Sequence, residues 1–164
     1  MRIATWNCNG AARHKITLFK QINADILILQ ECENPDVSND KNYKNWAEHF
    51  LWCGSNPKKG VGIFCKNNVK LKQLYWDTNN LEVFLPATVN NIAILAVWTK
   101  NKPYKYIEQF HQYMKFHSQK LQSEKQIICG DFNSNSQWDF RYKRGNHSQA
   151  VDMLQKKTNS QHIP

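Results

Sequence analysis

The sequence lacks a hydrophobic run long enough to cross a membrane or to form the core of a signal peptide. We therefore expect a cytoplasmic protein with no membrane span. Cysteine pairing is also unsupported, because the five cysteines are odd in number and include no C-x-x-C motif. This argues against a disulfide framework and against a structural zinc site. No internal repeat, low-complexity tract or linker interrupts the 164 residues, which predicts a single domain over residues 1–164.

Acidic residues are scarce: 13 Asp and Glu stand against 22 Lys and Arg, giving a formal charge of +9. A basic balance of this size favours a polyanionic partner, with nucleic acid as the first choice and an anionic membrane surface as the second. The simpler alternative is a small protein that is basic without a polyanionic partner.

Four apolar segments each end in polar side chains. They are residues 2–7, ending in Asn7; residues 25–31, ending in Gln30 and Glu31; residues 91–98, followed by Lys100 and Asn101; and residues 127–134, which carry Asp131 and Asn133. Short apolar runs of this kind are typical of buried strands. Because ligands gather outside the carboxyl ends of strands in α/β sheets, the four ends predict one polar crevice.

The remaining segments predict a mixed α/β fold. A strand, a helix over residues 13–23 and a second strand open the chain, and residues 43–52 are a short helix or an irregular aromatic segment. Strands are expected at 58–65 and 69–75, and the Asn90-Asn91 pair predicts a β-hairpin between residues 81–89 and 92–98. Helices are expected over residues 103–121, with Pro103 in the first turn, and from Asn146 or Ser148 onward.

Glu31 and Asp131 are the candidate metal-binding carboxylates. Two carboxylates brought together at a partly buried edge need a cation or raised pKa values, and oxygen ligands suit Mg²⁺ or Mn²⁺. Asn7 and Asn133 add neutral donors and acceptors for a phosphate oxygen or an attacking water. Any one of these residues alone is better explained as a cap or a turn former, so the inference depends on their joint occurrence.

Three blocks resemble the motifs of the endonuclease/exonuclease/phosphatase superfamily, the exonuclease III and DNase I-like group. They are TWN at residues 5–7, LQE at 29–31 and GDFN at 130–133, and the last is the most specific. The resemblance covers the chain from its start to about residue 135. It implies a DNase I-like four-layered α/β sandwich, with two sheets face to face and helices outside, and a metal-dependent phosphodiesterase activity.

The resemblance also implies roles for individual residues. Glu31 resembles the metal-binding glutamate and Asn7 the asparagine of the metal and phosphate shell. Asp131 resembles the aspartate that activates or orients the nucleophilic water, and Asn133 its partner. The implied cofactor is Mg²⁺ or Mn²⁺, and the implied activity is that of a nuclease.

Two departures from the family pattern concern the later part of the chain. Where the family has a Tyr or His after the hairpin strand, this sequence has WTKN, so phosphate contacts there are expected from Lys100 or Asn101. The closing Asp-His pair does not occur, which predicts a C-terminally truncated domain that lacks the last strands of the second sheet. The alternative is therefore an inactive short relative or a gene fragment. Such a protein would bind nucleic acid or a protein, and it would self-associate through an exposed sheet edge.

Aromatic and basic residues alternate after the GDFN block. Trp138 and Arg141 in the segment 137–144 are candidates for stacking on bases and for contacting phosphates, against the alternative of a partly buried loop. His147 is either a replacement proton donor or the start of a helix, whereas His111 is expected at the surface and His117 in the core. A flavodoxin-like binding domain is a third hypothesis, but residues 7–10 are too short and polar for its phosphate loop.

Overall fold

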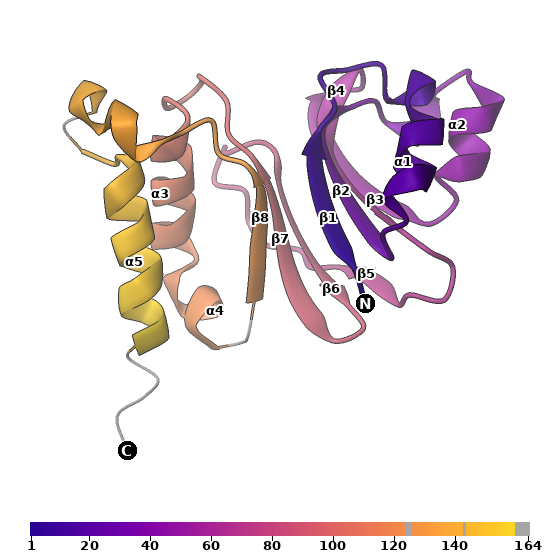
Figure 1. The fold of residues 1–164 in the computed structure, drawn as a ribbon. Helices are drawn as coiled ribbons and strands as arrows, with labels where there is room; N and C mark the ends of the chain where they lie inside the picture. Colours follow the sequence, from indigo (N-terminus) through magenta and orange to yellow (C-terminus); the bar gives the residue numbers. More distant parts are fainter. Residues whose placement is uncertain (124–125, 143, 160–164) are drawn as a thin grey trace. The chain divides into compact units, whose positions relative to one another are not determined.

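The computed structural model describes residues 1–123, 126–142 and 144–159. The chain divides into two compact units. The first contains Met1–Trp98 and Gln126–Asp131, and the second contains Thr99–Lys125 and Phe132–Pro164. The first unit contains both sheets (Figure 1).

The first sheet has four strands in the order β1-β2-β4-β3. The strands are β1 (Ile3–Asn7), β2 (Ile26–Cys32), β4 (Lys59–Cys65) and β3 (Phe50–Asn56). β1 and β2 are parallel and are joined through α1 (Ile16–Ile22), which confirms the predicted strand, helix, strand opening. The other pairs are antiparallel.

The second sheet has the order β5-β6-β7-β8. The strands are β5 (Leu71–Gln73), β6 (Phe84–Val89), β7 (Ile92–Trp98) and β8 (Gln126–Asp131). The predicted hairpin is present between β6 and β7. Asn90 and Asn91 at its turn have φ values of 48° and 68°, the left-handed conformation that a two-residue hairpin loop requires. β8 lies parallel to β7, with Asp131 opposite Trp98.

β2 is buried on both faces, which explains its continuous apolar sequence. Ile26 and Ile28 belong to a core cluster shared with residues of the second sheet, so the two sheets pack face to face. Leu27 and Leu29 belong to a second cluster on the opposite face, which contains Phe19 of α1. That face is covered by α1 and by α2 (Lys41–Trp46), as Figure 1 shows.

The second unit contains α3 (Ile107–Phe116), α4 (Ser118–Ser123), the short 3-10 helix η3 (Ser136–Arg141) and α5 (His147–Asn159). α3 and α5 lie side by side in it. His111 Nε2 of α3 lies 3.0 Å from the carbonyl oxygen of Asn146, at the start of α5. This contact buries His111, which is 4% exposed, so the predicted surface position for this histidine is wrong.

Two predicted elements differ from the observed ones. The helix predicted over residues 103–121 starts only at Ile107 and is divided at His117 into α3 and α4. Its expected first turn is a loop, because the side-chain amide of Gln109 donates to the carbonyls of Lys102 and Tyr104 at 2.6 and 2.8 Å. The aromatic segment 43–52 contains the end of α2 and then enters β3, a strand that the sequence pattern did not predict. In the described part of the chain, every helix is too short or too polar to span a membrane.

Gly130 provides a test of how β8 is held. Its φ is 145°, and a Cβ atom there would lie 1.9 Å from the carbonyl oxygen of Val97. We expect Gly130→Ala to lower the free energy of unfolding by roughly 2–4 kcal/mol, measured by urea denaturation.

Gly10→Ala is the matched control. Gly10 also has a positive φ, of 71°, but the nearest atom to an added Cβ is Cε of Lys59 at 3.9 Å. Only the backbone penalty applies there, about 1 kcal/mol. If Gly10→Ala and Gly130→Ala lowered the free energy of unfolding equally, the close packing of Gly130 against β7 would be contradicted.

Candidate active site

Three strand ends of the first unit bring Asn7, Glu31 and Asp131 together. Asn7 ends β1, Glu31 lies near the end of β2, and Asp131 ends β8 of the other sheet. The side-chain nitrogen of Asn7 donates to Glu31 Oε1 at 3.1 Å and to Asp131 Oδ2 at 2.6 Å. One amide therefore bridges two carboxylates that come from different sheets.

Glu31 points out of its strand because it occupies a β-bulge. Gln30 pairs with Val61 and Cys32 with Gly60, and Glu31 between them has no partner in the ladder. Its φ is 59°, a left-handed conformation that costs a non-glycine residue about 1–3 kcal/mol. Its carbonyl oxygen accepts a hydrogen bond from the backbone of Gly10 at 3.1 Å, which helps to hold this conformation. Strained residues at bulges commonly redirect functional side chains.

The loop after β1 fixes the orientation of Asn7. The Nζ of Lys15 donates to the carbonyls of Cys8 and Gly10, the latter at 2.8 Å. The backbone N–H of Asn9 donates to Asn7 Oδ1 at 2.9 Å. The amide oxygen is thus turned toward the loop, and the NH₂ group faces the two carboxylates.

Lys59 is a site residue that the sequence analysis missed. Its Nζ lies 2.7 Å from Glu31 Oε2, with side-chain exposures of 48% for Lys59 and 18% for Glu31. The only signal in the sequence is the Lys58-Lys59-Gly60 stretch. Because side chains alternate along a strand, only one of these two adjacent lysines can lie on the face of Glu31. Which lysine does so depends on the bulge in β2, and the sequence does not locate that bulge.

The pKa of Glu31 reflects these contacts. Burial alone raises it, but hydrogen bonds from Lys59 and Asn7 and the charges of Lys59 and Lys15 lower it, and the net pKa is below the ordinary value. Glu31 is consequently an ionised oxygen donor at neutral pH.

The donor set fits a hard divalent cation. The two carboxylates offer only oxygen ligands, which suit Mg²⁺ or Mn²⁺ rather than a thiolate-seeking metal. Among the described residues, no group of three or more His, Cys, Asp and Glu side chains could hold a metal. Glu31 would therefore hold such an ion mainly together with water ligands, an arrangement that Mg²⁺ favours.

The other predicted site residues belong to the second unit: Asn133, Lys100, Asn101, Trp138 and Arg141. Within that unit, the side-chain nitrogen of Asn133 donates to the carbonyl of Thr99 at 3.0 Å. Trp138 is 43% exposed in η3, and the guanidinium carbon of Arg141 lies 5.3 Å from the ring centroid of the exposed Phe140. The segment is therefore an exposed aromatic and cationic surface rather than a buried loop.

His147 begins α5, as the helix-start alternative predicts. Its backbone N–H donates to Asp139 Oδ1 at 2.9 Å, and its ring Nδ1 lies 2.9 Å from Ser134 Oγ. Asp139 also accepts from the backbone of Ser148 at 3.1 Å, so this carboxylate caps the helix.

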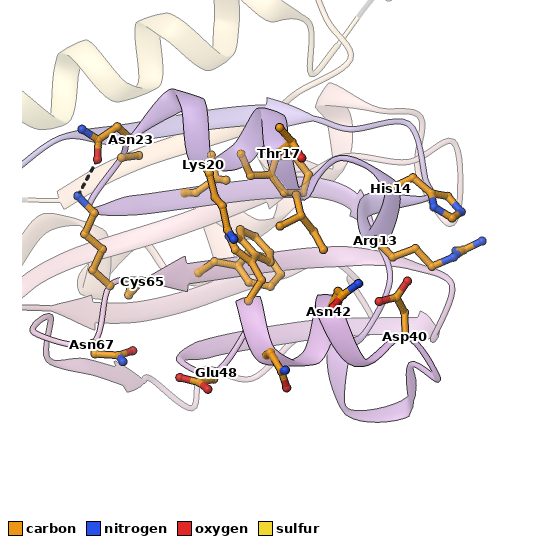
Figure 2. A pocket seen from close by; sticks show the side chains of 18 residues that line it. Arg13, His14, Thr17, Lys20, Asn23, Asp40, Asn42, Glu48, Cys65 and Asn67 are labelled. Atoms are coloured by element: carbon orange, nitrogen blue, oxygen red, sulfur yellow. Dashed lines mark hydrogen bonds between the residues drawn. The ribbon is translucent and has the colours of Figure 1, made fainter.

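A separate groove lies in the first unit beside α1 and α2 (Figure 2). Side chains of both charges surround it, among them Lys20 and Glu48, and Lys66 Nζ donates to Asn23 Oδ1 there at 3.1 Å. Its lining includes neither Glu31 nor Asp131. The groove is therefore distinct from the site that Asn7 bridges.

Comparisons with known proteins agree with this geometry. The model of the Endonuclease/Exonuclease/phosphatase family matches residues 4–152, which confirms the resemblance of the sequence motifs. No curated protein matches the chain.

Similar solved structures include three enzymes of this superfamily. An AP endonuclease from Archaeoglobus fulgidus is 20% identical, with a TM-score of 0.64, over 97% of this chain and 70% of that one. The 3′ phosphatase NExo from Neisseria, bound to a product DNA hairpin, is 17% identical, with a TM-score of 0.63, over 96% and 71%. A humanized TDP2 from D. rerio is 17% identical, with a TM-score of 0.57, over 87% and 70%. These similarities confirm the predicted DNase I-like α/β fold.

The lowered pKa of Glu31 predicts a pH-dependent contribution to stability. A carboxylate with a lowered folded-state pKa contributes stability above its unfolded-state pKa, and the contribution is lost as the pH falls through the folded-state pKa. We expect Glu31→Gln to be less stable than the wild type at pH 7 and the difference to shrink between about pH 5 and pH 3. Urea denaturation at a series of pH values measures this, and a difference that does not vary with pH would contradict the ion pair with Lys59.

Proposed function

Because the chain belongs to the endonuclease/exonuclease/phosphatase family, we propose that it is a metal-dependent phosphodiesterase that cleaves nucleic acid. The observation that carries the proposal is the pair of carboxylates, Glu31 and Asp131, that the Asn7 amide bridges. Nucleic acid is the proposed substrate because the chain has a formal charge of +9 and a similar structure is bound to a DNA hairpin.

In the proposed mechanism, Glu31 would hold Mg²⁺ or Mn²⁺, and Asn7 would stay beside the ion as the donor to both carboxylates. The ion would supply Lewis-acid stabilisation of the charge on the phosphate and on the leaving oxygen. Asp131 accepts the proton of the attacking water, whose oxygen bonds to phosphorus as the ester P–O bond breaks, and the leaving oxygen takes a proton from solvent. Asn133 is proposed as the partner of Asp131 on the resemblance of the GDFN block alone.

Asn7 prepares Asp131 for this role. Its amide donates to Asp131 Oδ2 at 2.6 Å and so fixes the direction of the carboxylate without adding charge. The same amide contacts Glu31, so the metal-binding and the proton-accepting carboxylates are held in one arrangement. Such fixed orientation lowers the reorganisation needed during reaction.

Substrate contacts are proposed for Lys100, Asn101, Trp138 and Arg141. The lysine and the asparagine would contact phosphate, and the exposed indole of Trp138 would stack on a base. Arg141 lies against an aromatic ring, where its charge stays available to a phosphate.

Binding without cleavage is the second candidate function. The observation that favours it is the ion pair between Lys59 and Glu31, which balances the charge of the carboxylate without a divalent ion. Such a protein would bind nucleic acid equally well with and without Mg²⁺, or would bind a protein or a second copy of itself through a sheet edge.

Cleavage assays distinguish the two functions. We expect the chain to cut at least one of abasic, double-stranded or single-stranded DNA or RNA with Mg²⁺ or Mn²⁺ present and none with EDTA. Glu31→Gln and Asp131→Asn should each lower the rate by about 10²-fold or more, because each removes a group that acts in the transition state. Fluorescent oligonucleotides on denaturing gels measure the products.

Asp36→Asn is the matched control for these variants, since Asp36 is an exposed aspartate of the short 3-10 helix η2 (Pro35–Val37). Its rate should equal that of the wild type. A folded wild-type protein that cleaves none of the substrates would replace the proposal by the binding function, and full activity of Glu31→Gln would remove Glu31 from the site.

Nucleic-acid binding tests the exposed segment in the second unit. We expect Trp138→Ala to weaken single-strand affinity in EDTA by about 1–3 kcal/mol, through the loss of base stacking. Arg141→Ala should weaken it too and lower the slope of log K against log salt by about one. Fluorescence anisotropy measures both effects, and Tyr75→Ala, which removes an 87% exposed aromatic of the first unit, is the control that should change neither.

A further inference from the structure

Both oxygens of the Glu31 carboxylate have hydrogen-bond partners. Oε1 accepts from Asn7 at 3.1 Å and Oε2 accepts from Lys59 at 2.7 Å. A divalent ion that binds Glu31 therefore competes with the ammonium group of Lys59 for the same oxygen.

We propose that Lys59 is an internal counter-ion of the site: it pairs with Glu31 when no divalent ion is bound, and moves to the substrate phosphate when the ion takes its place. The inference rests on the proposed function, and it assigns to Lys59 a role in metal affinity and substrate binding.

The backbone of β4 holds Lys59 at this position. Gly60 pairs with Cys32 beside the bulge, and an added Cβ at Gly60 would lie 2.2 Å from Cζ2 of Trp52. The indole nitrogen of Trp52 in turn donates to the carbonyl of Cys32 at 3.2 Å. The ring packed over Gly60 thus fixes the register of β4 next to Glu31, and the residue before Gly60 faces the carboxylate.

The side chain of Lys59 is able to move while its backbone stays. It is 48% exposed, whereas Glu31 is 18% exposed on a strained bulge. A lysine ammonium on its flexible four-carbon stem rotates freely compared with a bulged glutamate. Exchange of partners therefore requires no change in either sheet.

Charge balance gives the direction of the effect. With Lys59 in place, the two carboxylates and the ammonium sum to −1, and without it they sum to −2. A divalent cation binds more tightly to the more negative site, so Lys59 lowers metal affinity. Once displaced, the ammonium adds positive charge where a phosphate is bound and raises substrate affinity.

Manganese titration tests the first half of the proposal without any measurement of activity. Free Mn²⁺ is followed by electron paramagnetic resonance in solutions of wild type, Lys59→Met, Lys58→Met and Glu31→Gln. We expect Lys59→Met to bind Mn²⁺ about tenfold more tightly than the wild type. Lys58→Met removes the same charge from the neighbouring exposed residue and should bind like the wild type, while Glu31→Gln should bind far more weakly. Thermal unfolding of each variant checks that it is folded.

Steady-state cleavage tests the second half. We expect Lys59→Met to raise KM about tenfold at saturating Mn²⁺ with little change in kcat, and Lys59→Arg to restore most of the loss. An unchanged KM would overturn the transfer of Lys59 to phosphate.

The remaining outcomes separate this inference from the proposed function. Equal or weaker Mn²⁺ affinity in Lys59→Met, with Glu31-dependent binding in the wild type, overturns the counter-ion role and leaves the metal-dependent function intact. Absence of Mn²⁺ binding in both wild type and Lys59→Met overturns the metal-dependent function and the counter-ion role together.

Discussion

The site depends on a single amide. Asn7 donates to carboxylates that are brought together from two sheets, and without a donor between them Glu31 and Asp131 would repel each other. An amide stabilises both ionised groups and adds no charge, whereas a carboxylate at position 7 would add a third negative group. The NH₂ of Asn7 also links the last residue of β1 to the last residue of β8. The hydrogen bonds of the Asn7 amide therefore set the geometry of the site and also join the two sheets at this end.

Much of the fold follows from local sequence patterns. The apolar runs that end in Asn7, Glu31 and Asp131 are strands, because burial and alternation are properties of a few consecutive residues. The Asn90-Asn91 turn is equally local, since its backbone conformation suits asparagine. These signals were sufficient to predict three of the strand ends whose polar side chains meet in the candidate site.

The remaining features depend on contacts between distant residues, which a pattern does not contain. The bulge at Glu31 is a shift in pairing with β4, and it decides that Lys59 rather than its neighbour reaches the carboxylate. The start of α3 is set by Gln109, which binds loop carbonyls that precede it. His111 is buried because α5 packs against α3. The sequence pattern predicted a surface position for this polar residue because the pattern does not show that a second helix covers it.

The bulge and the amide bridge also bear on how the protein acquires its site during folding. Glu31 takes its position only after β2 and β4 have paired on both sides of it, and Asn7 meets Asp131 across 124 positions of sequence. Contacts between such distant positions form late, because the entropy of closing long loops must be overcome first. A nascent chain that has not yet reached β8 therefore presents a lone Glu31 and no paired carboxylates. If the proposed metal-dependent function holds, affinity for divalent cations is acquired only with the completed second sheet, and its appearance would mark the fully folded first unit.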